Sequence, residues 1–292
     1  MEIGEELRTR LLAYQRNELT EYHIYRRLAE AVQAPENRKV LQAIAADELR
    51  HSQNWKKHTA QDVQPYRARM WFYYWISRIF GLTFGIKLME QGEQGAQENY
   101  EVLRRELPEP EVEAMIRDEN EHELALIGLL DEERLRYVGS IVLGLNDALV
   151  ELTGALAGLT LALQDTRLIA LTGLITGMAA ALSMAASEYL STRAEDTRKE
   201  PLKASVFTGA AYIATVLVLI FPYLVLANYY LCLGWTLMAA VLIIALFNYY
   251  ISVAKDEPFQ RRFLEMAGVS LGVAGLSFGA GYLMRVFLGV EV

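Results

Sequence analysis

The stretch Glu48-Leu49-Arg50-His51 places a carboxylate three residues before one of the four histidines of this 292-residue chain. On a helix these two positions share a face, so both side chains can point at one object. The same spacing recurs in Glu119-Asn120-Glu121-His122. A single copy is typical of a solvated acidic helix, whereas two copies in one chain indicate a shared metal site.

The sequence around these motifs predicts four helices. Helical periodicity, interrupted near Pro35, Pro65 and Pro108, places them at 3–33, 36–60, 66–106 and 109–134. One Glu from each of two helices and a Glu-x-x-His from each of the other two is the ligand pattern of ferritin-like bundles that hold two metal ions. The expected metal ligands are Glu18, Glu48, His51, Glu90, Glu93, Glu119 and His122.

The ligand on the third helix stays open between two glutamates. Tyr25 follows Glu18 by seven residues and Tyr100 follows Glu93 by the same interval, which favours Glu93 and places both tyrosines near the metals as supporting residues. The interval to the next Glu-x-x-His motif favours Glu90 instead. Both glutamates could serve in different metal states.

Charge divides the chain into two predicted domains, 1–137 and 138–292. The first contains 25 of the 36 acidic residues, 19 of the 28 basic residues and all four histidines. The second consists mostly of long uncharged runs, a membrane pattern. The fold class is therefore all-α, a ferritin-like four-helix bundle followed by a transmembrane bundle. With one cysteine, Cys232, metal chemistry must use oxygen and imidazole ligands.

Five apolar segments of the second domain are long enough to span a bilayer. They are expected at 138–163, 168–191, 204–227, 230–253 and 264–288. Basic residues gather between the second and third and between the fourth and fifth. The positive-inside rule therefore predicts a cytoplasmic N-terminal domain and an outside C-terminus, with the prokaryotic plasma membrane as the expected location. The charged first twelve residues, which lack a signal-peptide core, agree with this.

Ionisable residues within the predicted spans are candidates for function because they are costly to place in a membrane. Asp147 and Glu151 share a face of the first span, and Met184 and Glu188 share a face of the second. Carboxylates with one thioether suit a divalent transition metal, although Met184 can equally be a packing residue. The expected transport path comprises Asp147, Glu151, Met184, Glu188 and Glu195.

Two family resemblances follow from these motifs. Residues 5–134 resemble the rubrerythrin branch of the ferritin-like superfamily through Glu18, Glu48-x-x-His51, Glu90-x-x-Glu93 and Glu119-x-x-His122. The second domain resembles the vacuolar iron transporter family through Gly144-Leu145-Asn146-Asp147 with Glu151, and through the stretch from Ser183 to Ser191. Their fusion resembles the membrane-bound ferritin family.

That resemblance implies a proton-coupled exporter of Fe²⁺ or Mn²⁺, with a dinuclear site of either metal in the first domain and Asp147 and Met184 along the membrane path. A homodimer embedded in lipid would suit both domains, whereas haem, nucleotides and nucleic acid are not expected. Two features differ from the relatives. The linker from Arg193 to Lys203 is short where vacuolar transporters carry a long acidic insert, and the chain has no four-cysteine iron module.

Three functions fit these features of the sequence. The first is a metal exporter whose first domain captures the metal. The second is an enzyme, a membrane-tethered di-iron ferroxidase or peroxidase whose spans serve as an anchor. The third gives the first domain a dimerising and sensing role without redox chemistry. The acidic residues at Asp147, Glu151 and Glu188 favour the exporter, because an anchor has no need of them.

Overall fold

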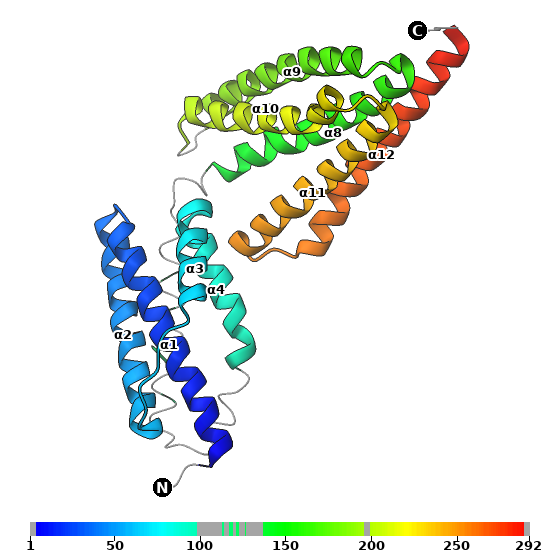
Figure 1. The fold of residues 1–292 in the computed structure, drawn as a ribbon. Coiled ribbons are helices and arrows are strands. Elements are labelled where there is room, and N and C mark those ends of the chain that lie inside the picture. Colours follow the sequence, from blue (N-terminus) through cyan, green and yellow to red (C-terminus); the bar gives the residue numbers. More distant parts are fainter. Residues whose placement is uncertain are drawn as a thin grey trace. The chain divides into compact units, whose positions relative to one another are not determined.

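The computed structural model describes residues 4–97, 137–195 and 199–288, together with positions 113, 117, 118, 121, 122 and 126. These residues form nine helices and no strands, so the expected all-α class is confirmed for the described part (Figure 1). The chain divides into two compact units, Met1–Glu132 and Glu133–Val292.

The first unit is built on a pair of long helices, α1 (Glu5–Ala31) and α2 (Pro35–Thr59), which lie side by side (Figure 1). Pro35 begins α2, a position where its missing N–H is not needed. Buried apolar side chains of both helices form the core of this unit, among them Ile24, Leu28, Leu41 and Ile44.

The expectation of one continuous helix over 66–106 is wrong within the described residues. The chain forms α3 (Arg67–Phe80) and α4 (Leu82–Gln97), separated by Gly81 with a φ of 108°. A helix cannot continue through this backbone conformation, which only glycine adopts readily. α4 then packs on α3 so closely that a Cβ on Gly85 would lie 2.7 Å from the Ser77 Cα.

The expected helix over 109–134 falls mostly outside the described residues. The six described positions in this range are all helical, and two of them, His122 and Leu126, are buried. The four-helix ferritin-like bundle therefore stays a prediction.

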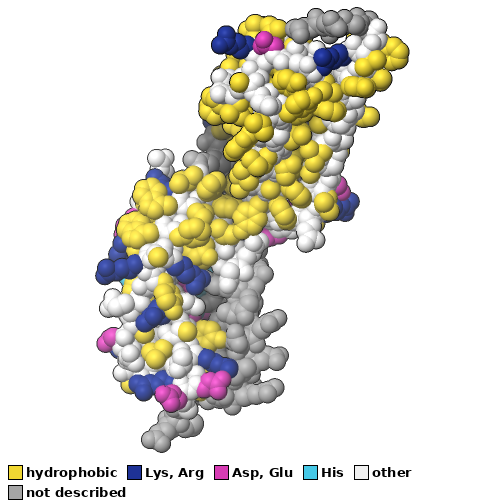
Figure 2. Space-filling model, turned by 45° about the vertical axis from the view of Figure 1, so that its right-hand side comes forward, with side chains coloured by type: hydrophobic (Ala, Val, Ile, Leu, Met, Phe, Trp, Pro, Cys, Tyr) yellow, Lys and Arg dark blue, Asp and Glu magenta, His cyan; other side chains and the backbone are white. Residues whose placement is uncertain are grey.

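Five helices of the second unit are long and apolar enough to cross a membrane, which confirms the number of spans expected. They are α8 (Val138–Leu163), α9 (Thr166–Ala194), α10 (Pro201–Val225), α11 (Tyr229–Lys255) and α12 (Phe259–Leu288). Figure 2 shows hydrophobic side chains gathered over the face of this unit that is in view. Leu224, Leu276 and Phe287 are among the exposed ones, as suits helices that face lipid.

Short connections between the spans use side-chain caps. Asp165 accepts hydrogen bonds from the backbone N–H groups of Arg167 and Leu168 at the start of α9. Asn228 does the same for Tyr230 and Leu231 at the start of α11. These caps satisfy backbone donors that have no partner within the helix, which explains why polar residues interrupt the apolar sequence there.

Small residues set the spacing around α8, which packs against α9, α10, α11 and α12. A Cβ on Gly144 would lie 2.2 Å from the Thr208 carbonyl oxygen of α10. On the other side, a Cβ on Gly281 of α12 would lie 2.4 Å from the Gly158 carbonyl oxygen of α8. Glycine is therefore required at both helix crossings, as expected for closely packed membrane helices.

Candidate metal-binding sites

The first unit contains a buried group of three potential metal ligands. Glu18 of α1 and Glu48 and His51 of α2 each offer a ligand atom, and these atoms all lie within 4.8 Å of one another. Glu48 and His51 are 2% and 1% exposed. Among the described residues, this is the group in which three or more His, Cys, Asp or Glu side chains approach closely enough to hold one ion.

His122 joins this group from the second Glu-x-x-His motif. Its Nδ1 lies 3.2 Å from Glu48 Oε1, and the His51 Nδ1 lies 3.8 Å from Glu48 Oε2. The two imidazole rings are 6.1 Å apart. Glu48 therefore lies between two histidines that come from motifs more than 70 residues apart in the sequence.

The other ring nitrogen of each histidine contacts an aspartate. His51 Nε2 lies 3.2 Å from Asp118 Oδ2, and His122 Nε2 lies 3.1 Å from Asp47 Oδ2. Arg50 forms ion pairs of 2.7 Å with both aspartates. A carboxylate on the far nitrogen fixes the ring orientation of a metal-binding histidine and increases its basicity.

The donors of this group suit a divalent metal ion. Two carboxylates and two imidazoles converge, and the Glu48 Oε2 is buried without a hydrogen-bond partner. Such an atom is costly to bury unless a cation or donor satisfies it. Trp55 donates from Nε1 to Glu18 Oε1 over 3.3 Å, which holds that carboxylate in place while its Oε2 lies 3.7 Å from His51 Nδ1.

The pKa values of Glu48 and His51 in this group differ strongly from their ordinary values. Burial alone would raise the pKa of Glu48, but contacts with His122 and His51 outweigh burial and lower this pKa to about 2. Burial alone would lower the pKa of His51, but Glu18 and Glu48 outweigh it and raise this pKa to about 11. Without metal, a protonated imidazole thus compensates the carboxylates, and a metal ion would replace that proton.

The remaining residues expected at this site are described only in part. Glu90 and Glu93 belong to α4, but their side chains lie outside the described residues, as do Glu119 and Tyr100. The choice between Glu90 and Glu93 therefore stays open. Tyr25 is buried in the core of the first unit.

In the second unit, two of the expected path residues accept hydrogen bonds from neighbouring helices; Glu151 is exposed and Glu188 is half-buried. Glu151 Oε2 accepts from the Tyr212 hydroxyl of α10 over 2.8 Å. Glu188 Oε1 of α9 accepts from the Ser140 hydroxyl of α8 over 2.6 Å. Glu151 and Tyr212 also line a cavity of about 540 Å³ between α8, α9, α10 and α12, whose walls are mostly small residues.

The other expected path residues have varied surroundings. Asp147 is half-buried on α8, and Met184 of α9 is half-buried and packs against the apolar core of the unit. Glu195 is exposed and accepts a hydrogen bond from Ser191. Within the described part of the chain, the acids of the second unit do not converge as those of the first unit do.

Sequence reasoning missed two kinds of residue. Asp47 and Asp118 each stand directly before the Glu of a Glu-x-x-His motif, a repeated position that could have signalled their role. Tyr212 and Ser140 hold carboxylates of the membrane helices, and no sequence pattern distinguishes them from packing residues.

The class of protein follows from the five apolar spans, which make the chain an integral membrane protein. Comparison with known families adds a specific assignment: residues 138–198, which include α8 and α9, match the VIT family and form a VIT family domain. That domain implies a metal ion transporter. None of the curated proteins and none of the solved structures compared with the chain matches it.

Proposed function

We propose that this protein exports Fe²⁺ or Mn²⁺ across the membrane and that its first unit is a ferritin-like domain that captures or senses the metal. The observation that carries the proposal is the pairing of a VIT family domain with a separate buried group of carboxylates and imidazoles in one chain. Oxygen and imidazole donors suit both metals, so the donor set does not choose between them.

Capture by the first unit is supported by its donor geometry. Glu18, Glu48, His51 and His122 supply two carboxylates and two imidazoles to one volume. In the proposal Glu119 and either Glu90 or Glu93 complete a site for two ions, with Tyr25 and Tyr100 nearby. The bound ions would supply charge that neutralises the converging carboxylates, and Asp47 and Asp118 would keep the histidines oriented toward them.

In the proposal, transport through the second unit uses four acidic residues and one methionine on or next to α8 and α9. Asp147, Glu151, Met184, Glu188 and Glu195 form the proposed path. A carboxyl group must release its proton before it binds a metal ion, so metal and proton compete for the same side chain. This competition supports export by exchange against protons.

Charge and the cavity at Glu151 support the proposed orientation and assembly. Basic residues near the ends of α9 and α11 favour a cytoplasmic first unit and an outside C-terminus. The cavity at Glu151 is open and bordered by small residues, which supports a homodimer in which a second copy covers it.

Uptake of Fe²⁺ into proteoliposomes containing the full-length protein tests the proposal. Uptake should follow an imposed proton gradient and disappear in Asp147→Ala, while metal binding by the first unit persists. Asp256→Asn is the matched control, because this exposed acid has a φ of 53°, which Asn also tolerates, and its variant should transport normally. Transport by Asp147→Ala at the normal rate would rule out this path.

The second candidate function is a membrane-tethered di-iron ferroxidase or peroxidase. The buried donor group of the first unit favours it, since carboxylate and imidazole ligands also suit oxygen chemistry at iron. The purified protein would then consume oxygen or peroxide in the presence of Fe²⁺, and Glu48→Ala would lose that turnover. A protein that binds iron without consuming either oxidant would serve for capture or sensing alone.

A further inference from the structure

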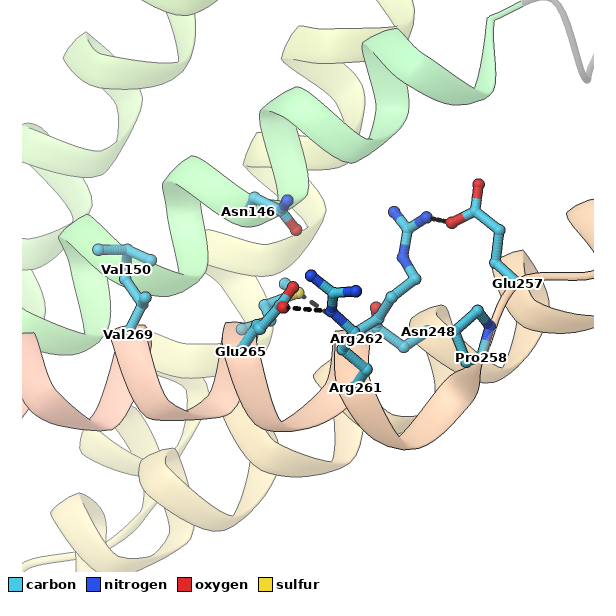
Figure 3. A pocket seen from close by; sticks show the side chains of 10 residues that line it. Asn146, Val150, Asn248, Glu257, Pro258, Arg261, Arg262, Glu265 and Val269 are labelled. Carbon is cyan, nitrogen blue, oxygen red and sulfur yellow. Dashed lines mark hydrogen bonds and ion pairs between the residues drawn. The ribbon is translucent and has the colours of Figure 1, made fainter.

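A polar pocket of about 600 Å³ lies between α8, α11 and α12 of the second unit. It opens near the start of α12, where α11 turns into α12 (Figure 3). The residues of the proposed path do not line it. Its polar residues are Asn146, Asn248, Glu257, Arg261, Arg262 and Glu265.

The charged residues of the pocket balance one another. Arg261 Nε pairs with Glu265 Oε1 at 2.9 Å, and Arg262 Nη1 pairs with Glu257 Oε2 (Figure 3). Each guanidinium group has five N–H donors, and each ion pair uses one nitrogen, so donors remain on both arginines. Each carboxylate likewise keeps an oxygen for a further partner. The pocket thus offers groups of both signs without a net charge.

One buried hydrogen-bond acceptor in this pocket has no hydrogen-bond donor. The Asn146 Oδ1 is buried and makes no hydrogen bond, and Figure 3 shows its side chain on α8 facing the Glu265 and Arg261 side chains of α12. Asn248 is 3% exposed, and its Nδ2 donates to the Ile244 carbonyl and to Met266 Sδ. Because the Asn146 oxygen is buried, leaving it without an N–H or cationic partner is costly.

The pocket changes from charged to apolar along its length. Glu257, Arg261 and Arg262 lie at one end, and Val150 and Val269 lie at the other (Figure 3). α8 has 26 residues and is therefore about 39 Å long, longer than the roughly 30 Å hydrocarbon core. The ends of the spans thus reach the headgroup layer, and the charged end of the pocket lies where a lipid headgroup would be.

We propose that this pocket binds the headgroup of a phospholipid that carries a primary ammonium, as phosphatidylethanolamine does. The phosphate would accept hydrogen bonds from the free guanidinium donors of Arg261 and Arg262. The ammonium would donate to Asn146 Oδ1 and to Glu265. A choline headgroup has no N–H to give to Asn146, and a glycerol headgroup has no positive charge for Glu265. A metal ion is opposed by the two guanidinium groups beside the carboxylates.

Lipid binding by the delipidated full-length protein tests this proposal. Phosphatidylethanolamine, phosphatidylcholine and phosphatidylglycerol with identical acyl chains are added separately, and bound lipid is counted by native mass spectrometry. We expect about ten-fold stronger retention of the ethanolamine lipid than of the choline lipid, from one charged hydrogen bond. That preference should disappear in Asn146→Ala, and retention should fall in Arg262→Gln. Arg285→Gln, near the other end of α12, is the matched control and should behave as wild type.

Two results would overturn the proposal. The first is equal retention of ethanolamine and choline lipids by the wild-type protein. The second is a divalent metal ion that binds without lipid and is lost in Asn146→Ala, which would make the pocket a cation site. Displacement of the lipid by soluble phosphoethanolamine at similar concentration would support the headgroup chemistry and assign it to a soluble molecule instead.

Discussion

Asp118 Oδ2 lies 3.2 Å from His51 Nε2, and the contact is reciprocated by Asp47 and His122 at 3.1 Å. The aspartate before each Glu-x-x-His motif thus contacts the histidine of the other motif. Arg50 joins the two aspartates, so both histidines are held by one connected set of charges. Two motifs that are distant in the sequence therefore orient each other's metal-binding side chains.

Replacing Asp118 with asparagine should weaken metal binding by the first unit. The variant keeps the size of the side chain but removes the negative charge that orients His51 and increases its basicity. We expect about a 10- to 100-fold loss of affinity, as for other partners of metal-binding histidines. Competition between the full-length protein and a chromophoric chelator for Co²⁺ measures this affinity.

Asp62→Asn is the matched control for Asp118→Asn. Asp62 is an exposed acid of the same unit that pairs only with Lys56 among the described contacts, so its variant should bind metal normally. An Asp118→Asn variant with unchanged affinity would show that this aspartate does not support the site.

The metal-free first unit should lose stability as the pH rises above neutrality. The pKa of His51 is raised from 6.5 to about 11 in the folded chain, so its stabilising contact is fully present below pH 6.5 and disappears as the pH approaches about 11. The lowered pKa of Glu48 affects stability only at acid pH. The stability that ionised Glu48 contributes is lost as the pH falls from 4.5 to about 2. Melting curves of metal-free wild type and His51→Gln should differ by about 1–3 kcal/mol near pH 6 and converge as the pH rises.

Metal provides the control for this pH dependence. Bound metal replaces the proton of His51, so the metal-loaded wild type should keep its melting temperature between about pH 7 and about pH 9. If the metal-free difference between wild type and His51→Gln were constant over the same range, the raised pKa of His51 would be refuted.

Tyr212→Phe should slow metal transport. The Tyr212 hydroxyl is the donor to Glu151 Oε2, and without it a carboxylate of the proposed path loses a hydrogen bond to a charged group, which is worth about 1.5–3 kcal/mol. We expect at least about a ten-fold lower rate of Fe²⁺ uptake in proteoliposomes.

Tyr223→Phe separates the role of Tyr212 from general packing. Tyr223 lies on the same helix and its hydroxyl also forms a buried hydrogen bond, but its partner is Thr160 rather than an acid. Uptake should stay within about two-fold of wild type in this variant, because the change affects fold stability and not the path. Equal losses in both variants would assign the effect to packing.

Gly281→Ala should destabilise the second unit. A Cβ at this position would lie 2.4 Å from the Gly158 carbonyl oxygen, so α12 must move away from α8. The cost should be about 1–3 kcal/mol and should lower the melting temperature in detergent. Gly279→Ala on the same helix has no atom within 4 Å of its added Cβ and should be neutral or slightly stabilising. Equal melting temperatures of the two variants would contradict the close approach of α12 to α8 at Gly281.

Several features of the fold could be predicted from composition and local sequence. Each membrane helix is long and apolar over its own length, and the α8 bounds agree with the expected range 138–163. The break at Gly81 was not predictable, because a glycine permits a positive φ without requiring it and the surrounding residues have a helical pattern. Packing of α4 back on α3 at Ser77 and Gly85 decides that break.

The sequence by itself determined the residue types of the candidate site, two Glu-x-x-His motifs and a glutamate on α1, because helix periodicity fixes which side chains of one helix share a face. Only the tertiary structure decided which residues meet across helices: Asp118 with His51, Tyr212 with Glu151, and Asn146 with the charged end of α12. Such contacts depend on how helices pack and cross. Those geometries are set by interlocking side chains from distant segments, so a local sequence pattern does not predict them.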